Sequence, residues 1–248
     1  MEGLGPREEE RYSRQIILEE LGEAGQLKLK RARVGILGLG GLGSPVAQYL
    51  TAAGVGKLVL VDDQAPEISN LNRQVLHWEE DCKLGTPKVK SAATKLKKLN
   101  SRVQIEPIQL RISEENIEDV FSSVDLVVDC LDDFQPRLLL NNFCVQSKKP
   151  FIHGAVESFH GQVTTIIPGS TPCLRCIFPM APPKKVRIPI LGATAGVFGS
   201  IQAAEAVNLI VGAGAPLSSR LLVGDLLRQE WETIKLCRIE SCKVCGHL

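Results

Sequence analysis

A glycine-rich turn between two apolar segments carries the clearest chemistry in the sequence. Residues 34–37 are apolar and β-rich, and a G-x-G-x-x-G pattern with an extra glycine follows, made of Gly38, Gly40, Gly41 and Gly43. Asp62 ends a second apolar segment, residues 57–61, and lies 19 residues after Gly43. In a strand–turn–helix context the glycines bring backbone N–H groups to phosphates, and the acid accepts hydrogen bonds from ribose hydroxyls. The pattern therefore predicts an adenine-nucleotide site.

Each glycine has its own expected role. We expect Gly38 to permit the tight turn, Gly40 to let the backbone approach the phosphates, and Gly43 to let helix and strand pack closely. The same glycines suit a dehydrogenase, and a glycine-rich loop of an ordinary α/β domain would share them. The residues around the pattern must decide between these readings.

Charged residues in later loops favour ATP over a nicotinamide cofactor. Arg73 lies in a turn-rich loop after Asp62, Lys88 follows Pro87 at the start of a predicted helix, and Asp132 follows a predicted strand. If these loops meet at the carboxyl edge of a sheet, Arg73 and Lys88 neutralise phosphate charge and Asp132 holds Mg²⁺. An NAD-dependent oxidoreductase would leave these three residues without a role.

Two C-x-x-C pairs supply a candidate metal site. They are Cys173 with Cys176 and Cys242 with Cys245, and 65 residues separate the pairs. Four thiolates in two such pairs predict a tetrahedral Zn²⁺ site in a reducing compartment, pinning the C-terminal tail to a proline-rich segment. A redox dithiol is the alternative, but such a motif normally follows a strand and opens a helix, and we expect neither pair to do so.

The other cysteines are expected to be structural. Cys237 ends an apolar segment and is predicted to be buried rather than a fifth ligand. Cys82, Cys130 and Cys144 have no partner spacing, so buried free cysteine is their expected state.

Composition limits the classes of partner. The chain has 248 residues, 29 basic and 28 acidic, so its formal net charge of +1 predicts neither nucleic-acid nor membrane-surface binding. The N-terminus is charged and has no apolar signal region, which predicts a cytoplasmic protein. The uncharged residues 188–204 contain glycine, threonine and serine, and we interpret them as part of a buried helix.

The elements that must position these residues alternate as in a Rossmann-like, doubly wound α/β fold. We expect a mostly parallel sheet with N-terminal helices and an antiparallel C-terminal extension. A single domain is expected, divided into N-terminal helices (1–33), a nucleotide-binding core (34–167), an irregular crossover with the first cysteine pair (168–192) and a C-terminal region (193–248). Strands are predicted at residues 34–37, 57–61, 103–108, 124–129, 151–156, 162–167, 219–223 and 231–236, and helices within 11–33, after 43, at 87–99, from 113, at 136–147 and at 193–211.

Several blocks together resemble one enzyme family. They are Arg11-Tyr12-Ser13-Arg14-Gln15, the glycine-rich turn continued by Ser44-Pro45, Ser69-Asn70-Leu71-Asn72-Arg73-Gln74, Gly85-Thr86-Pro87-Lys88, Asp129-Cys130-Leu131-Asp132 and the paired C-x-x-C motifs. In this order they resemble the ThiF/MoeB/HesA family, relatives of ubiquitin-activating enzymes, and the pattern is nearest to MoeB-type enzymes. The resemblance implies ATP-dependent adenylation of the C-terminal glycine of a small ubiquitin-fold carrier protein ending in Gly-Gly, with pyrophosphate released.

The resemblance also implies residue roles. Asp62 would hold the ribose, Arg73 and Lys88 the phosphates, and Asp132 the Mg²⁺, while Arg14 would reach the ATP site of a second subunit in a homodimer. Ser69, Asn70 and Asp133 would belong to the nucleotide site as well. No general base is needed because a C-terminal carboxylate is already ionised at neutral pH. We therefore expect His77, His153, His160 and His247 to be structural or surface residues.

Two departures from the family pattern matter. Lys185 stands where many relatives carry a cysteine that forms a thioester or persulfide, and no cysteine lies between Cys176 and Cys237. The chain is therefore expected to stop at the acyl-adenylate and to leave sulfur delivery to a separate donor. Asp133 stands where many relatives have asparagine, and either metal binding or simple exposure would suit it.

Three rival functions remain open at this stage. An enzyme of the same family could adenylate a peptide terminus or a modified tRNA base, although the near-zero net charge argues against tRNA. An NAD-dependent oxidoreductase would explain the glycines and Asp62. A non-catalytic binding module stabilised by zinc would explain the cysteines.

Overall fold

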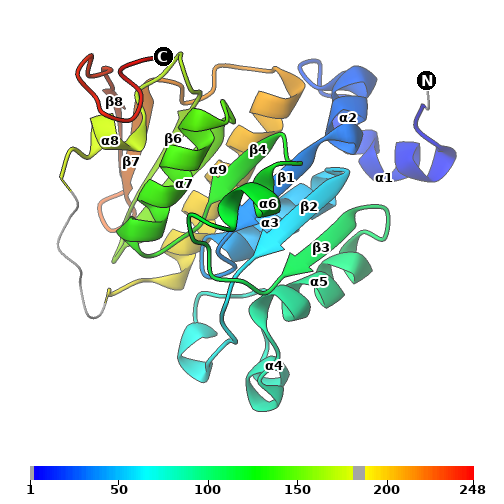
Figure 1. The fold of residues 1–248 in the computed structure, drawn as a ribbon. Coiled ribbons are helices and arrows are strands. Elements are labelled where there is room, and N and C mark those ends of the chain that lie inside the picture. Colours follow the sequence, from blue (N-terminus) through cyan, green and yellow to red (C-terminus); the bar gives the residue numbers. More distant parts are fainter. Residues whose placement is uncertain (1–2, 181–187) are drawn as a thin grey trace.

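The computed structural model describes residues 3–180 and 188–248. Its strands form one eight-stranded sheet in the order β3-β2-β1-β4-β5-β6-β7-β8 (Figure 1). The expected Rossmann-like α/β architecture is confirmed. The segment that contains Lys185 lies outside the described residues, so its role remains a prediction.

The N-terminal half of the sheet is parallel. It contains β1 (Arg33–Leu37), β2 (Lys57–Val61), β3 (Gln104–Ile108), β4 (Leu126–Asp129) and β5 (Phe151–Glu157). β1 pairs with β2 on one side and with β4 on the other, so the chain reverses its direction of winding between β1 and β4. In open α/β sheets, ligands bind at the carboxyl ends of the strands that flank this reversal.

The C-terminal half is antiparallel, as expected from the sequence. β6 (His160–Ile166) pairs with β5, β7 (Arg220–Asp225) pairs with β6, and β8 (Glu230–Lys235) forms the edge. Phe151 at the start of β5 lies opposite Ile166 at the end of β6. The segment after β6 therefore leaves the sheet at the amino end of the parallel strands, away from the predicted nucleotide edge.

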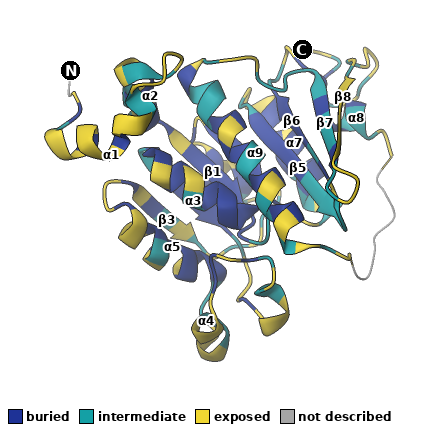
Figure 2. Cartoon of the chain, turned by 180° about the vertical axis from the view of Figure 1, so that it is seen from behind, coloured by how far each residue is buried: buried dark blue, intermediate teal, exposed yellow. Residues whose placement is uncertain are grey.

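Helices cover both faces of the sheet. α6 (Ile117–Phe121) and α7 (Phe134–Gln146) cover one face (Figure 1), and α3 (Gly43–Ala53), α5 (Lys88–Leu99) and α9 (Gly192–Val211) cover the other (Figure 2). Alternate residues of one strand serve the two layers, because Ile36 packs into the cluster under α3 and α9 whereas Leu37 packs into the cluster under α6 and α7. α1 (Pro6–Ile16) and α2 (Gly22–Arg31) precede β1 and lie at one end of the molecule.

α9 is long and apolar enough to cross a membrane by length and composition, but it behaves as a core helix. It packs against α3 and β5, and half of its most apolar window is buried. Gln202 lies in its middle and is fully buried. The interpretation of residues 188–204 as a buried helix is confirmed from Gly192 onward, whereas residues 188–191 precede the helix and are at least partly exposed.

Short helices depart from the sequence expectation. η1 (Ile68–Asn70) lies in the turn-rich loop after Asp62, where residues 64–78 were expected to be loop, and α4 (Glu79–Leu84) lies between that loop and α5, where no helix was predicted. α8 (Leu174–Ile177) lies within the segment predicted to be irregular, and Cys173 is its N-cap. The expectation that neither cysteine pair opens a helix is wrong for the first pair, because the proline-rich segment still accommodates one helical turn between Pro172 and Pro179.

Candidate functional site

The loops after β1 and β4 touch at the reversal point of the sheet. The Cys130 N–H donates to Leu37 O at 2.9 Å. Gly38 has φ +93°, and a Cβ at this position would lie 2.7 Å from Cys130 O. A side chain would therefore be strained and would collide with the neighbouring loop, which agrees with the turn predicted for Gly38.

The next glycines make room for close packing at the start of α3. A Cβ at Gly43 would lie 2.0 Å from Gly38 O, so only glycine lets the helix start this close to the strand. A Cβ at Gly41 would lie 3.0 Å from the Cβ of Ala195 in α9. Neither α3 nor α9 has a side-chain hydrogen bond at its N-cap. Two helix N-termini thus converge beside the glycine-rich turn with free capacity for an anion.

Asp62, at the end of β2, supports the glycine-rich turn. Its Oδ2 accepts a hydrogen bond from Leu39 N at 2.8 Å, and its Oδ1 accepts one from Gln64 N at 2.9 Å. The carboxylate is half-buried and lies beside the turn. Each oxygen can accept further hydrogen bonds, so the place fits the ribose role expected for Asp62.

Arg73 reaches the same place from the loop after β2. A Cβ at Gly41 would lie 3.5 Å from Arg73 Cγ, and the Arg73 guanidinium donates to Ser69 O at 3.0 Å. Ser69 itself is exposed, and Asn70 Oδ1 accepts from Glu67 N at 3.1 Å. In this structure Ser69 and Asn70 shape the turn that holds Arg73.

Lys88 is buried at the first turn of α5. Only 3% of its surface is exposed, and its Nζ donates to Gln64 Oε1 at 2.8 Å. Burying an ammonium group against a neutral amide costs free energy that an anionic ligand would offset. The buried Lys88 ammonium group therefore suits the binding of an anionic phosphate.

Asp132 and Asp133 follow β4 and differ in their surroundings. Asp132 is exposed, whereas Asp133 is the N-cap of α7 and accepts a hydrogen bond from Gln135 N at 3.2 Å. Capping thus accounts for an acid at position 133 without a metal.

Arg14 is not brought to this edge within one chain. It is exposed in the last turn of α1. Arg11 of the same helix donates to Leu99 O at the end of α5, and Tyr12 accepts from Asn100, so α1 packs at the amino end of the sheet. Arg14 could act on a nucleotide only in another copy of the chain.

Buried polar residues that no sequence pattern assigned to the nucleotide site support this edge. His77 Nε2 donates to Leu39 O at 2.9 Å, and His77 Nδ1 accepts from Ser91 at 2.9 Å. Burial lowers the pKa of His77, so the imidazole is neutral. Leu39 is therefore held by His77 on its carbonyl and by Asp62 on its N–H. No repeating pattern in the sequence indicates that His77 contacts Leu39. Its position just before the short helix α4 is the one available signal.

A second buried group lies at the end of β4, where Asp129 stands three residues before Asp132. Asp129 ends β4, Arg137 lies in α7, and His153 lies in β5, and all three are almost wholly buried. Asp129 Oδ2 lies 3.5 Å from Arg137 Nη1 and accepts from His153 Nδ1 at 2.7 Å. Burial alone would raise the pKa of Asp129, but the Arg137 charge and the His153 hydrogen bond outweigh it and the pKa is lowered. The sequence signal for this group is Asp129, an acidic residue at the end of an apolar strand.

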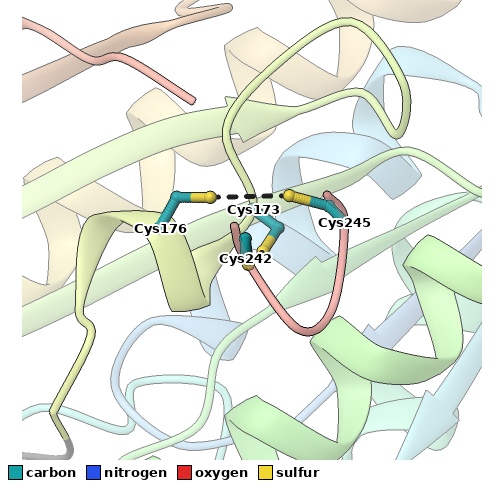
Figure 3. A group of neighbouring side chains, drawn as sticks. All are labelled: Cys173, Cys176, Cys242 and Cys245. Atoms are coloured by element: carbon teal, nitrogen blue, oxygen red, sulfur yellow. Dashed lines mark hydrogen bonds between the residues drawn. The ribbon is translucent and has the colours of Figure 1, made fainter. Parts of the chain in front are cut away.

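The two C-x-x-C pairs come together at the amino end of the parallel strands, where the chain leaves β6. Figure 3 shows the four side chains facing one another. Cys173 Sγ lies 3.7 Å from Cys242 Sγ, and Cys176 Sγ lies 3.4 Å from Cys245 Sγ. All four sulfurs lie within 4.8 Å of one another, and no disulfide joins them. Tetrahedral Zn–S bonds of about 2.3 Å place sulfurs about 3.8 Å apart, so the cluster fits a zinc site.

Local polarity favours the thiolate of Cys242, whereas burial raises the pKa values of Cys173 and Cys176. Burial opposes ionisation of Cys242, but the N–H groups of Cys245 and Val244 outweigh it and lower the pKa of Cys242 to about 7. Ile239 N also donates to Cys176 Sγ at 3.5 Å. The donor set suits a thiolate-bound metal.

The remaining cysteines were predicted to be buried, and two of the predictions are wrong. Cys237 is exposed, because it follows the edge strand β8, all of whose residues are exposed to solvent. Cys82 is only half-buried, because it lies on the short helix α4 at the surface. Cys130 and Cys144 are buried as expected.

Comparisons with known proteins agree with this geometry. The family model described as "ThiF family" matches residues 12–244. The "SAMP-activating enzyme E1" of Haloferax volcanii is 44% identical over 242 residues, which cover 96% of this chain and 88% of that protein. The "Sulfur carrier protein adenylyltransferase" of Thermus thermophilus is 41% identical over 248 residues, covering 96% of this chain and 90% of that one. The crystal structure of E. coli MccB with ATP is similar at a TM-score of 0.85 and 26% identity, covering 95% of this chain and 74% of MccB.

Proposed function

The chain belongs to the ThiF family, and from that premise we propose that it adenylates the C-terminal glycine of a small ubiquitin-fold sulfur-carrier protein, using ATP and releasing pyrophosphate. The observation that carries the proposal is the convergence of the glycine-rich turn, Asp62, Arg73 and two uncapped helix N-termini at one sheet edge. The relatives named for adenylation cover nearly the whole chain.

The chemistry needs charge neutralisation more than proton transfer. The carrier's terminal carboxylate is ionised at neutral pH and attacks the α-phosphorus, while pyrophosphate leaves. Negative charge on the triphosphate opposes this approach. Arg73 and Lys88 would neutralise the phosphates, Asp132 would hold Mg²⁺, and Asp62 would orient the ribose. Mg²⁺ supplies further neutralisation of the phosphate oxygens when it is bound.

The active form in this proposal is a homodimer in the cytoplasm. Arg14 lies at the far end of its own chain from the nucleotide edge, which supports delivery of this residue to a partner copy. The resemblance to the family assigns Arg14 that role. The partners are then a carrier ending in Gly-Gly and a separate sulfur donor.

We propose that no covalent enzyme–carrier intermediate forms. Cys130 is the cysteine that adjoins the nucleotide edge, and burial together with the Asp129 charge raises its pKa well above the usual value. Its Sγ donates to the buried Gln202 at 3.9 Å. A thiol of this kind is a poor nucleophile. The pathway would then stop at the acyl-adenylate.

Zn²⁺ has a structural role in this proposal. The four cysteines leave no open ligand position, and the cluster joins α8 to the C-terminal tail at the end of the sheet opposite the nucleotide.

Mass spectrometry of the reaction products tests the proposal. The chain mixed with ATP and a Gly-Gly carrier should give bound carrier acyl-adenylate, which sulfide releases as a thiocarboxylate. A denaturing gel without reductant should show no thiol-sensitive adduct. An adduct mapped to Cys130, or to any other cysteine, would overturn the absence of covalent capture while leaving adenylation intact.

Parallel reactions with a peptide, a modified tRNA and NAD in place of the carrier distinguish the rival functions. Formation of an adenylate on a peptide terminus or a modified tRNA base in place of the carrier would favour another substrate of the same family. Reduction of NAD without pyrophosphate release would indicate an oxidoreductase, and no turnover with any of these substrates would indicate a binding module.

A further inference from the structure

The turn between β4 and α7 is held by a buried ion pair that reaches back to its own backbone. Asp129 Oδ1 accepts a hydrogen bond from Leu131 N at 3.1 Å. Arg137, one turn into α7, donates through Nη2 to Leu131 O. Both polar backbone groups of Leu131 are therefore bound by the Asp129–Arg137 pair. Since Leu131 O belongs to the peptide that joins Leu131 to Asp132, the pair fixes the peptide that leads into Asp132.

The guanidinium is anchored from several sides. Arg137 Nη1 donates to Gly154 O in β5 at 2.8 Å, and the Arg137 side chain is 6% exposed. His153 Nδ1 carries a proton and donates a hydrogen bond to Asp129 Oδ2 at 2.7 Å. The same nitrogen therefore cannot accept a hydrogen bond from the nearby Arg137 Nη1. The guanidinium is thus held by a carboxylate and two carbonyls, which gives it one orientation.

Stability alone does not account for this arrangement. Removing a carboxylate and a guanidinium from water carries a large desolvation cost for each ion, and well-packed apolar side chains at such sites are often equally stable. Asp133 already caps α7, so the helix does not need Arg137 to begin. The Asp129–Arg137 pair instead fixes the peptide that precedes the exposed Asp132 carboxylate.

We propose that Arg137 is a positioning residue for Asp132. The Arg137 guanidinium, anchored on Asp129 and Gly154, would orient the Leu131–Asp132 peptide so that the Asp132 carboxylate faces a divalent cation. This inference rests on the proposed function, because it takes Asp132 as the ligand of the nucleotide's cation. Loss of a residue that orients a metal ligand in this way typically lowers metal affinity by about 10–100-fold.

The test measures Mn²⁺ binding rather than turnover. The full-length protein is saturated with a non-hydrolysable ATP analogue, and free Mn²⁺ is followed by electron paramagnetic resonance. Arg137→Lys keeps the positive charge beside Asp129 but has no second nitrogen for Leu131 O. We expect its Mn²⁺ affinity to fall about tenfold or more, and Asp132→Asn to weaken binding to a similar or larger extent.

Two comparisons distinguish a positioning role of Arg137 from a general loss of protein stability. The double variant Arg137→Lys/Asp132→Asn should bind Mn²⁺ no more weakly than Asp132→Asn alone, because Arg137 acts through Asp132. Glu205→Gln is the matched control, since Glu205 is buried in α9 and accepts from Thr165 at 2.5 Å and from Leu217 N at 2.7 Å. It should lower the melting temperature without changing Mn²⁺ affinity.

The possible results decide between the claims. Wild-type Mn²⁺ affinity in Arg137→Lys, or independent effects that multiply in the double variant, would overturn the positioning role alone. Failure of the wild-type protein to bind Mn²⁺ with the nucleotide would refute the proposed ATP site and the positioning role together. If Arg137→Lys does not fold, Asp129→Asn takes its place, because it keeps the acceptor for Leu131 N but weakens the anchor, and it should lower Mn²⁺ affinity in the same direction.

Discussion

The nucleotide edge and the cysteine cluster lie at opposite ends of the sheet and are held together in different ways. At the nucleotide edge, loops after three strands bind one another directly, as when Asp62 and His77 hold both polar groups of Leu39. At the cysteine cluster, four thiols face one another beside an edge strand whose residues are all exposed. The folded chain thus pre-organises the first region, whereas the second region is arranged for an ion to complete.

This difference predicts that the two regions can be disabled separately. A site built from protein hydrogen bonds should keep its shape when one ligand-binding charge is removed. A site whose core is a metal should lose its local structure when one ligand is removed, because zinc binding contributes on the order of 10 kcal/mol in small structural sites.

The largest expected effect is on activity at the nucleotide edge. Asp132→Ala and Arg73→Ala should each lower carrier-dependent pyrophosphate exchange by about 100-fold or more, because each removes charge stabilisation at the reacting phosphates. Lys88→Ala should act in the same direction but also leaves a cavity, since Lys88 is buried. Lys90→Ala is the control, because Lys90 is exposed on the same helix. Near-normal exchange in Asp132→Ala would refute the metal assignment.

The next effect is on the stability of the cysteine end. Elemental analysis should find about one zinc per chain, and Cys173→Ser should lose both the metal and several degrees of melting temperature. Hydrogen exchange should then increase in α8 and after residue 237, and stay unchanged in β1 and β4. Cys237→Ser provides a matched control because Cys237 is exposed and should leave the zinc content unchanged. Stoichiometric zinc in the double variant Cys173→Ser/Cys242→Ser would exclude this ligand set.

The smallest effect concerns the neutral imidazoles that support the nucleotide edge. Burial lowers the pKa values of His77 and His153 from 6.5. The unfolded chain therefore takes up protons that the folded chain does not as the pH falls below about 6.5, so stability is complete above that pH and declines toward the lower folded pKa values. Between pH 7.5 and 5.5 each imidazole should cost at most about 1.4 kcal/mol of unfolding free energy.

Thermal melts at the two pH values measure this loss. His153→Asn keeps a donor for Asp129 but cannot titrate, so its melting temperature should fall less on acidification than that of the wild type. His160 is exposed in β6 and its ion pair with Asp225 at 3.3 Å is open to solvent, so His160→Asn should change the decline little. An equal decline in all three proteins would show that other groups cause the acid sensitivity.

The sequence allowed prediction of the glycine-rich turn and of the acid beside it because their signals are local. The spacing of Gly38 and Gly43 specifies a turn that only glycine can adopt, and Asp62 follows at the distance that one helix and one strand require. The mostly parallel sheet could also be anticipated, since alternating strands and helices favour parallel pairing. The C-terminal hairpin showed as two apolar segments and was found as β7 and β8.

The parts that were missed depend on tertiary contacts. Arg137 is an ordinary residue in a helix until α7 packs over Asp129 and buries its charge. Cys237 follows an alternating apolar pattern that suggests burial, yet β8 lies at the edge of the sheet and is exposed. No local spacing distinguishes a central strand from an edge strand, so the exposure of Cys237 could not be derived from the sequence.

The measurement that tests the central claim most directly is exchange of radiolabelled pyrophosphate into ATP by the wild-type protein. Exchange should require a carrier whose C-terminal Gly-Gly carboxylate is intact, and it should disappear when that terminus is amidated or the last glycine is removed. Exchange that proceeds equally with the amidated carrier, or no exchange with any Gly-Gly carrier while the protein still binds ATP, would contradict adenylation of the carrier's carboxylate at this sheet edge.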